Sequence, residues 1–236
     1  MGSAAGGRAL QVSTESGKGR NRIVRPVRLI VYSDYLCPWC YNASVRLRRL
    51  EEELGSDLVI TWRSYLLRPA PKGERDAERF RAYTQSWLRP AEEEDSGTFR
   101  PWATDAAPPS HSVPAHVAAK AAATLGRDEF HRMHDALLYA YFAENRDISA
   151  AATLEEIWRE QRLPAVEFAR TEDPALRDEV LSDHVEAQTL GMTGVPAARF
   201  EGNEAFITGA LPLAMYRRWI DRHLSASSLA SSPRES

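Results

Sequence analysis

A change in the spacing of apolar residues near the start of the chain restricts its fold more than any other pattern. Val27, Leu29 and Val31 alternate with Arg28, Ile30 and Tyr32 in an apolar-rich run, which is typical of a β-strand. Over residues 40–54 they recur at spacings of three and four, and Gly55 then supplies a helix stop. Residues 58–67 return to a strand pattern and are followed by prolines. Strand, helix and strand within about 40 residues predict a βαβ unit.

The middle of the chain is helical in pattern, and strand patterns return only near its end. Thr153 and Glu156 are typical of a capping box, and Asp173 before Pro174 indicates another helix start. After Gly194, two short strand patterns flank a turn and predict a β-hairpin over residues 197–208. Further helices are predicted over residues 78–88, 114–125, 128–144, 174–191 and 212–224.

This order of elements predicts an α/β fold in which an all-helical insertion separates a βαβ half from a ββα half. The two halves are expected to form one domain. The N-terminal leader is rich in Gly, Ser and Arg, the C-terminal tail is rich in Ser, and both are predicted to be disordered. The predicted boundaries are residues 26–71 and 190–224 for the α/β domain, 72–189 for the insertion, 1–25 for the leader and 225–236 for the tail.

Composition narrows the class of function. Thirty basic and 33 acidic residues leave a net charge of −3, which provides no broad positive field for nucleic acid. The sequence contains no apolar run of about 18 residues, so we expect no membrane span. The leader lacks the apolar stretch of a secretory signal, and we therefore expect a cytoplasmic protein.

Both cysteines of the chain lie in one motif, Cys37-Pro38-Trp39-Cys40, between the first predicted strand and helix. Two unrelated core cysteines, a zinc site and a redox dithiol are the possible interpretations. A zinc site needs four ligands, and the closest histidine pair is His131 and His134, which we interpret as helix-surface or core-edge residues. We therefore expect no metal, and a CxxC motif beside a βαβ unit favours a thioredoxin-like redox site.

The predicted geometry gives the two sulfurs different roles. Cys37 falls at the helix start, where unpaired N–H groups and the helix dipole stabilise a thiolate, and Pro38 fits the first turn because it has no N–H. Cys40 falls on the buried helix face and is expected to resolve mixed disulfides formed by an exposed Cys37. Trp39 is either a packing residue or a lid over the sulfurs. Asp34 is expected to form a local cap or turn, with a proton relay as the alternative.

With these residues in view, the sequence resembles the DsbA-type branch of the thioredoxin superfamily, and most of all its FrnE-like members. The matching motifs are Tyr32-Ser33-Asp34 before Cys37-Pro38-Trp39-Cys40-Tyr41, and Thr193-Gly194-Val195-Pro196 after the helical block. The resemblance covers residues 27–224 and implies a thioredoxin-like fold. It also implies that Pro196 is cis beside the dithiol, so that the free backbone of Val195 binds a substrate strand. His111 stands where relatives often carry asparagine, near the expected site.

The leading hypothesis is a thiol–disulfide oxidoreductase of the reductase or isomerase type, acting on protein or small-molecule disulfides through Cys37 and Cys40. The alternative is a glutathione-dependent isomerase or transferase, similar to hydroxychromene-carboxylate isomerases and kappa-class transferases. Those enzymes do not require a second cysteine, so Cys40 argues against them. A third hypothesis is a peptide-binding or chaperone-like module. We expect no bound cofactor apart from glutathione as reductant or co-substrate, and either a monomer or a homodimer.

Overall fold

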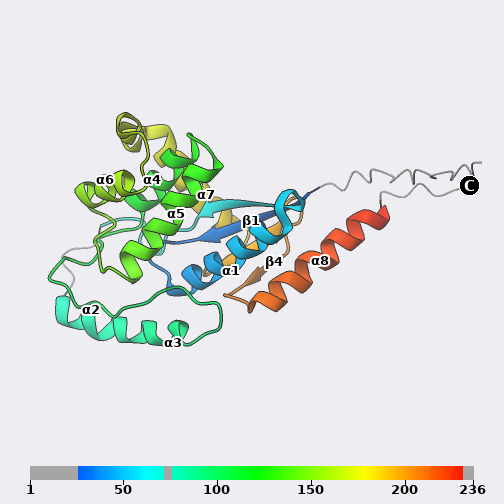
Figure 1. The fold of residues 1–236 in the computed structure, drawn as a ribbon, viewed down its shortest axis with the longest axis horizontal. Coiled ribbons are helices and arrows are strands. Elements are labelled where there is room, and N and C mark those ends of the chain that lie inside the picture. The colour runs from blue at the N-terminus through cyan, green and yellow to red at the C-terminus, as the bar shows by residue number, and fades with distance from the viewer. Residues whose placement is uncertain (1–25, 72–75, 231–236) are drawn as a thin grey trace, which may run out of the picture.

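The computed structural model describes residues 26–71 and 76–230, and Figure 1 shows how their elements are arranged. A four-stranded sheet has the order β2-β1-β3-β4. Strand β1 (Val27–Ser33) pairs in parallel with β2 (Leu58–Ser64) and antiparallel with β3 (Ala197–Phe200), which pairs antiparallel with β4 (Phe206–Thr208). The chain therefore brings segments about 170 residues apart into adjacent strands, with Leu29 opposite Phe200.

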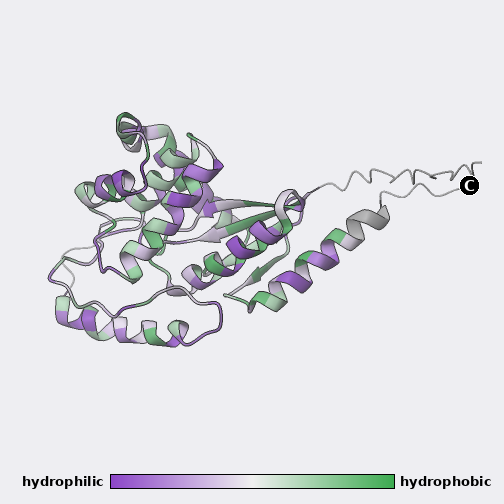
Figure 2. Ribbon diagram, viewed as in Figure 1, coloured by the Kyte–Doolittle hydropathy of each residue, from purple (hydrophilic) through white to green (hydrophobic). Residues whose placement is uncertain are grey.

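Helices cover both faces of this sheet. Helices α1 (Pro38–Leu54) and α8 (Leu213–Ala230) lie on one face, where Leu47 and Ile220 pack with Leu29 and Val31. The end of α7 (Pro174–Thr189) lies on the other face. Because β1 is buried from both sides, its sequence is apolar almost throughout, and Figure 2 shows hydrophobic strands at the centre of the fold.

The remaining helices form a separate layer beside the sheet (Figure 1). Its core, which includes the fully buried Trp87, Phe142 and Trp158, is larger than either core against the sheet. The helices are α2 (Ala77–Thr84), α3 (Leu88–Ala91), α4 (Val113–Ala123), α5 (Arg127–Phe142) and α6 (Ala151–Glu160), and a 3₁₀ segment spans Ala165–Glu172.

The structure confirms the predicted α/β fold with a helical block between the βαβ and ββα segments. The predicted capping box is wrong, because α6 begins at Ala151 and Thr153 therefore lies inside the helix. The tail also begins later than predicted, since α8 continues to Ala230 beyond the expected end at Leu224. The predicted leader, 1–25, and the last six residues lie outside the described residues. None of the helices within residues 26–71 and 76–230 combines the length and the apolar composition that a membrane span requires.

Gly97 is packed against the helix that carries the cysteines. A Cβ atom at this position would lie 2.5 Å from ring carbons of Tyr41, the residue after Cys40. We expect Gly97→Ala to lower the free energy of unfolding by about 1–3 kcal/mol, because the ring has to move to avoid the clash. Urea denaturation measures this change. Gly194→Ala is the control for stability, since a Cβ there would meet nothing within 4 Å, and equal losses in both variants would contradict the prediction.

Candidate active site

Cys37 caps the N-terminus of α1. Its backbone is extended, with φ −99° and ψ 114°, and its Sγ accepts a hydrogen bond from the backbone N–H of Cys40 at 3.4 Å. Pro38 follows in the first turn, where a backbone N–H would have no helical partner. The sulfur thus lies where the N–H groups of the helix are directed, a position that favours negative charge.

The two sulfurs differ in their surroundings as their positions on the helix predict. Cys40 is fully buried, and burial together with the neighbouring Cys37 raises the pKa of its thiol well above the ordinary value. Cys37 is only 6% exposed, so the prediction of an exposed nucleophile is wrong, although Cys37 is more accessible than Cys40. The reason is a contact with a distant segment, because the carbonyl of Val195 lies 3.4 Å from Cys37 Sγ and covers one side of it.

Val195 reaches the dithiol from a loop that connects α7 to β3. The Val195–Pro196 peptide bond is cis, and Cys37 Sγ donates to the Val195 carbonyl across 158 residues of sequence. The half-buried Val195 and the buried Pro196 therefore lie beside the first cysteine. An extended disulfide substrate that enters here meets both a sulfur and an adjacent backbone segment.

Asp34 lies beneath the turn that leads into α1. Its carboxylate is fully buried and accepts from the backbone N–H groups of Leu36 at 2.6 Å and Leu67 at 2.7 Å. It therefore orders the local turn. Burial, opposed by these hydrogen bonds, raises the pKa of Asp34 to about 6, and the Asp34 charge in turn helps to raise the pKa of Cys40.

His116, for which no sequence pattern predicted a role, faces this carboxylate. Its Nε2 lies 4.0 Å from Asp34 Oδ2 and has no hydrogen-bond partner among the described residues. Burial, together with the charge of Lys120, lowers the pKa of His116 to about 3, so the ring is neutral. A histidine one turn into an Ala-rich helix gives no sequence signal of this kind.

Trp39 and Arg89 form the half-exposed side of the site. Trp39 is partly buried, and the guanidinium carbon of Arg89, from α3, lies 5.9 Å from the centroid of a Trp39 ring. In the described part of the chain, no carboxylate pairs with Arg89. The contact holds Trp39 at the edge of the site, and no sequence pattern had indicated Arg89.

His111 is not brought into contact with the dithiol. Its Nδ1 lies 2.8 Å from the hydroxyl of Ser110, and partial burial together with the charge of Arg177 lowers the pKa of the ring. No described contact joins His111 to Cys37 or Cys40. The sequence-based placement of His111 at the site therefore gains no support from the geometry.

The histidine pair considered for zinc has other partners. His134 is buried, and its two ring nitrogens lie 2.9 Å from the Tyr35 hydroxyl and 2.8 Å from the Ser44 hydroxyl. It is thus a core residue rather than the surface or edge residue that was predicted. His131 faces Glu51 at 3.3 Å. Among residues 26–71 and 76–230, no group of three or more His, Cys, Asp and Glu side chains is arranged to hold a metal.

Comparison with known proteins shows the family to which this chain belongs. The sequence profile of the DSBA-like thioredoxin domain matches residues 28–221. A candidate protein disulfide isomerase from Nitrosomonas europaea superposes with a TM-score of 0.72 at 16% identity, covering 85% of this chain and 98% of that chain. A comparison with curated proteins found no match.

A second similar structure is the cytosolic disulfide reductase DsbM from Pseudomonas aeruginosa. It has a TM-score of 0.66 and 23% identity, with 86% of this chain and 99% of that chain covered. The same protein with GSH gives a TM-score of 0.63 at 23% identity over 84% and 96% of the two chains. At these identities the superpositions show a shared fold, whereas the profile match spans most of the sequence. The chain belongs to the DSBA-like thioredoxin-domain family of thiol–disulfide oxidoreductases.

Proposed function

We propose that this protein reduces or isomerises disulfides through Cys37 and Cys40. The observation that carries the proposal is the placement of Cys37 Sγ at the N-cap of α1, between the Cys40 N–H and the Val195 carbonyl. Cys37 thiolate attacks one sulfur of a substrate disulfide, and the other substrate sulfur leaves and takes a proton. Cys40 then loses its proton and attacks Cys37 Sγ, which releases the second substrate thiol and leaves a Cys37–Cys40 disulfide.

Each supporting residue has a separate part in this proposal. Pro38 and the cap geometry keep Cys37 at the helix terminus, and Val195 and Pro196 bind the substrate backbone. Asp34 accepts the proton that Cys40 must lose, because it is a buried carboxylate whose charge interacts with that thiol. In isomerisation the substrate itself displaces Cys37, whereas in reduction an external thiol must return two electrons to the oxidised enzyme.

We infer that the net direction is reduction in the cytoplasm, with glutathione as the external thiol. The similarity to a cytosolic disulfide reductase, one of whose structures contains GSH, supports this direction and this reductant. Cytosolic thiols are also kept reduced by glutathione, which returns a dithiol to its active form. The test is a two-way assay, in which reduction of a disulfide peptide should exceed oxidation of the reduced peptide at a cytosolic glutathione ratio. Faster oxidation would contradict the inferred direction.

The glutathione-dependent isomerase or transferase remains the competing function. The fully buried Cys40, in contact with Cys37 Sγ, favours the dithiol mechanism, because a glutathione transferase needs only the first position. Product analysis separates the two. A stable glutathione adduct of an organic substrate, formed at equal rate by Cys40→Ala, would support the competing function and contradict the dithiol mechanism.

Arg89 is expected to favour disulfides that carry negative charge. Its guanidinium is exposed, has no carboxylate partner among the described residues and contacts Trp39 beside Cys37. Arg89→Gln should lower the rate with anionic glutathione disulfide about threefold and raise the rate with cationic cystamine, because losing this positive charge weakens the attraction of the anion and the repulsion of the cation. Neutral hydroxyethyl disulfide is the control. Equal changes for all three substrates would contradict a charge-specific role.

A further inference from the structure

We propose that Glu186 is a positioning residue, which holds the Val195–Pro196 loop over Cys37 through ion pairs with Arg199 and Arg63. The consequence for turnover rests on the proposed function, but the positioning itself is a property of the folded chain. Glu186 lies on α7 and makes no described contact with either cysteine, so its positioning effect on the dithiol passes through the loop.

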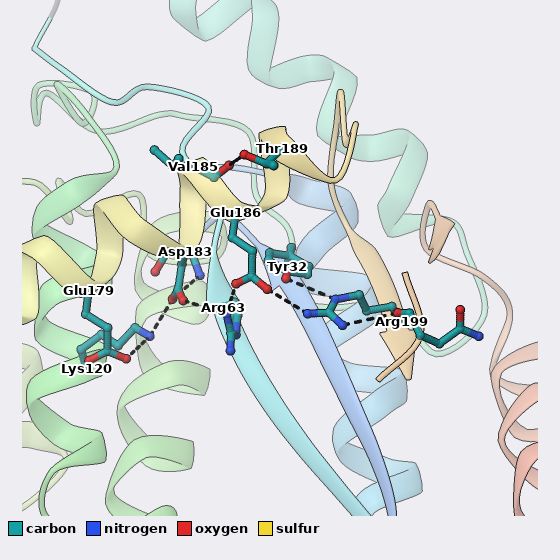
Figure 3. Close-up of polar contacts among 11 residues, drawn as sticks. Tyr32, Arg63, Lys120, Glu179, Asp183, Val185, Glu186, Thr189 and Arg199 are labelled. Carbon is teal, nitrogen blue, oxygen red and sulfur yellow. Dashed lines mark hydrogen bonds and ion pairs between the residues drawn. The ribbon is translucent and has the colours of Figure 1, made fainter. Parts of the chain in front are cut away.

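The ion pair joins the two ends of the loop. Helix α7 ends at Thr189 and β3 begins at Ala197, so the connecting segment contains Val195 and Pro196. Glu186 lies one turn before the end of α7, and Arg199 lies at the third position of β3. Figure 3 shows the side chains of Glu186 and Arg199 pointing toward each other, with 2.8 Å between Glu186 Oε1 and Arg199 Nη2.

Each oxygen of the Glu186 carboxylate has its own arginine. Oε2 accepts from Arg63 Nη1, on β2, while Oε1 accepts from Arg199. Arg199 also lies over Tyr32 of β1, with its Nε 3.4 Å from the tyrosine hydroxyl (Figure 3). The end of α7 is therefore connected to three adjacent strands, and two bonds to one carboxylate fix its orientation.

The exposure of the three side chains determines how much their ion pairs contribute to the free energy of unfolding. The side chains of Glu186 and Arg63 are about one-third exposed, whereas that of Arg199 is 12% exposed. Water therefore screens the pairs in part, and their effect on global stability is expected to be small. Within the loop, Leu190, Gly191 and Met192 donate back to α7, and the Pro196 carbonyl accepts from the Gly209 N–H. The segment from Thr193 to Val195 is therefore the part of the loop whose position is most sensitive to the pair.

A second set of ion pairs on the same helix provides a comparison. Lys120, on α4, lies 2.6 Å from Glu179 and 2.7 Å from Asp183 (Figure 3). Asp183 also accepts from the backbone N–H of Ser64. The Lys120–Glu179 pair fixes α7 to α4 and makes no link to β3. Glu179 thus carries the same charge as Glu186 and lies on the same helix, but its ion pair does not connect the two ends of the loop.

Loosening the loop has two opposite consequences at Cys37. The residue Cys37 is 6% exposed and its Sγ donates to the Val195 carbonyl, so movement of the loop opens the sulfur to a small reagent. A disulfide substrate, by contrast, has to be held by the same loop in a fixed geometry, and its exchange becomes slower. A merely stabilising residue would not produce this divergence.

The experiment measures alkylation of Cys37 by iodoacetamide in a Cys40→Ser background, where one thiol remains. Glu186→Gln is expected to raise the alkylation rate about threefold and Glu179→Gln to leave it within a factor of about 1.5. Arg199→Gln should raise it as Glu186→Gln does, because the same pair is lost. In the two-cysteine protein, Glu186→Gln should slow exchange with a disulfide peptide.

Two results would overturn the proposal. Equal alkylation rates in the Glu186→Gln and Glu179→Gln proteins would show that the loop does not depend on the pair. Opposite effects of Glu186→Gln and Arg199→Gln would show that charge near Cys37, rather than position, is responsible. Thermal unfolding checks that all variants are folded. If the wild-type protein exchanges no disulfide while the alkylation rates follow the expected order, the proposed function fails and the positioning role stands.

Discussion

Replacing Cys37 with serine is expected to lower disulfide-exchange turnover by more than about 10³-fold, because a hydroxyl at this position cannot provide a thiolate-like nucleophile at neutral pH. The loss should be in turnover and not in folding, since serine differs from cysteine by one atom. Turnover is measured with a disulfide peptide and glutathione. Unchanged turnover in Cys37→Ser would show that the chemistry does not use this sulfur.

The matched variant is Cys40→Ser, which should stop the same reaction at a different point. Cys37 can still attack, but without Cys40 the mixed disulfide is resolved only by external thiol. Mass spectrometry of the quenched reaction should therefore find the peptide linked to Cys37 in Cys40→Ser and absent from Cys37→Ser. A peptide adduct on Cys40 would reverse the assigned roles, although full burial of Cys40 argues against that outcome.

Asp34→Asn is expected to change how stability depends on pH. The pKa of Asp34 is about 6 in the folded chain against an ordinary value of 3.8, so the folded state retains this proton to a higher pH than the unfolded state. Between these two values the unfolded state ionises first, and the free energy of unfolding falls as pH rises. The whole effect of this group is about 3 kcal/mol and is complete above about pH 7.

Asparagine at position 34 cannot ionise, so this pH dependence is lost. The substitution also costs one hydrogen bond, because the side-chain NH2 group of asparagine faces the backbone N–H of Leu36 or Leu67 and two donors cannot pair. The mismatch is independent of pH. The free energy of unfolding of Asp34→Asn should therefore gain on that of wild type by about 2 kcal/mol from pH 4 to pH 7, and by about 3 kcal/mol from pH 2 to pH 7. The two proteins have to be compared because His116, which is buried and neutral, makes the free energy of unfolding rise with pH in both of them. A pH-independent difference would contradict the account of this carboxyl.

The same substitution tests the proton transfer from Cys40. If Asp34 accepts that proton, Asp34→Asn should slow the resolving step about 100-fold while the first attack by Cys37 is unchanged. Stopped-flow measurement of mixed-disulfide formation and decay separates the two steps. Asp173→Asn is the control, because Asp173 is the exposed N-cap residue of α7 and makes no described contact with either cysteine. Equal slowing of both steps would indicate a structural defect instead.

Local patterns in the sequence were sufficient to predict the fold and the position of the dithiol. The strand–helix junction at Cys37 follows from apolar spacing alone, because β1 and α1 each bury a continuous face against the same core. The cap position of Cys37 and the early helical position of Pro38 follow from the same junction. The cis peptide bond before Pro196 was expected only from a family resemblance, since local sequence rarely specifies a cis bond.

What the sequence could not predict depends on contacts between distant segments. The closeness of Glu186 to Arg199, of Asp34 to His116 and of Trp39 to Arg89 is decided by how the helical layer packs on the sheet. The small exposure of Cys37 has the same origin, because the residue that covers it is 158 positions away. Thr153 failed as a helix cap because the helix could begin two residues earlier without a side-chain cap.

Equilibrium of the wild-type protein with glutathione buffers tests the central claim most directly. In each buffer the free thiols are trapped with an alkylating reagent, and mass spectrometry then gives the fraction of protein that carries a Cys37–Cys40 disulfide. We expect a single two-electron transition near the cytosolic glutathione poise of about −220 to −260 mV, with no other adduct at either end. Absence of the Cys37–Cys40 disulfide even in the most oxidising buffer would contradict a dithiol that cycles between reduced and oxidised forms.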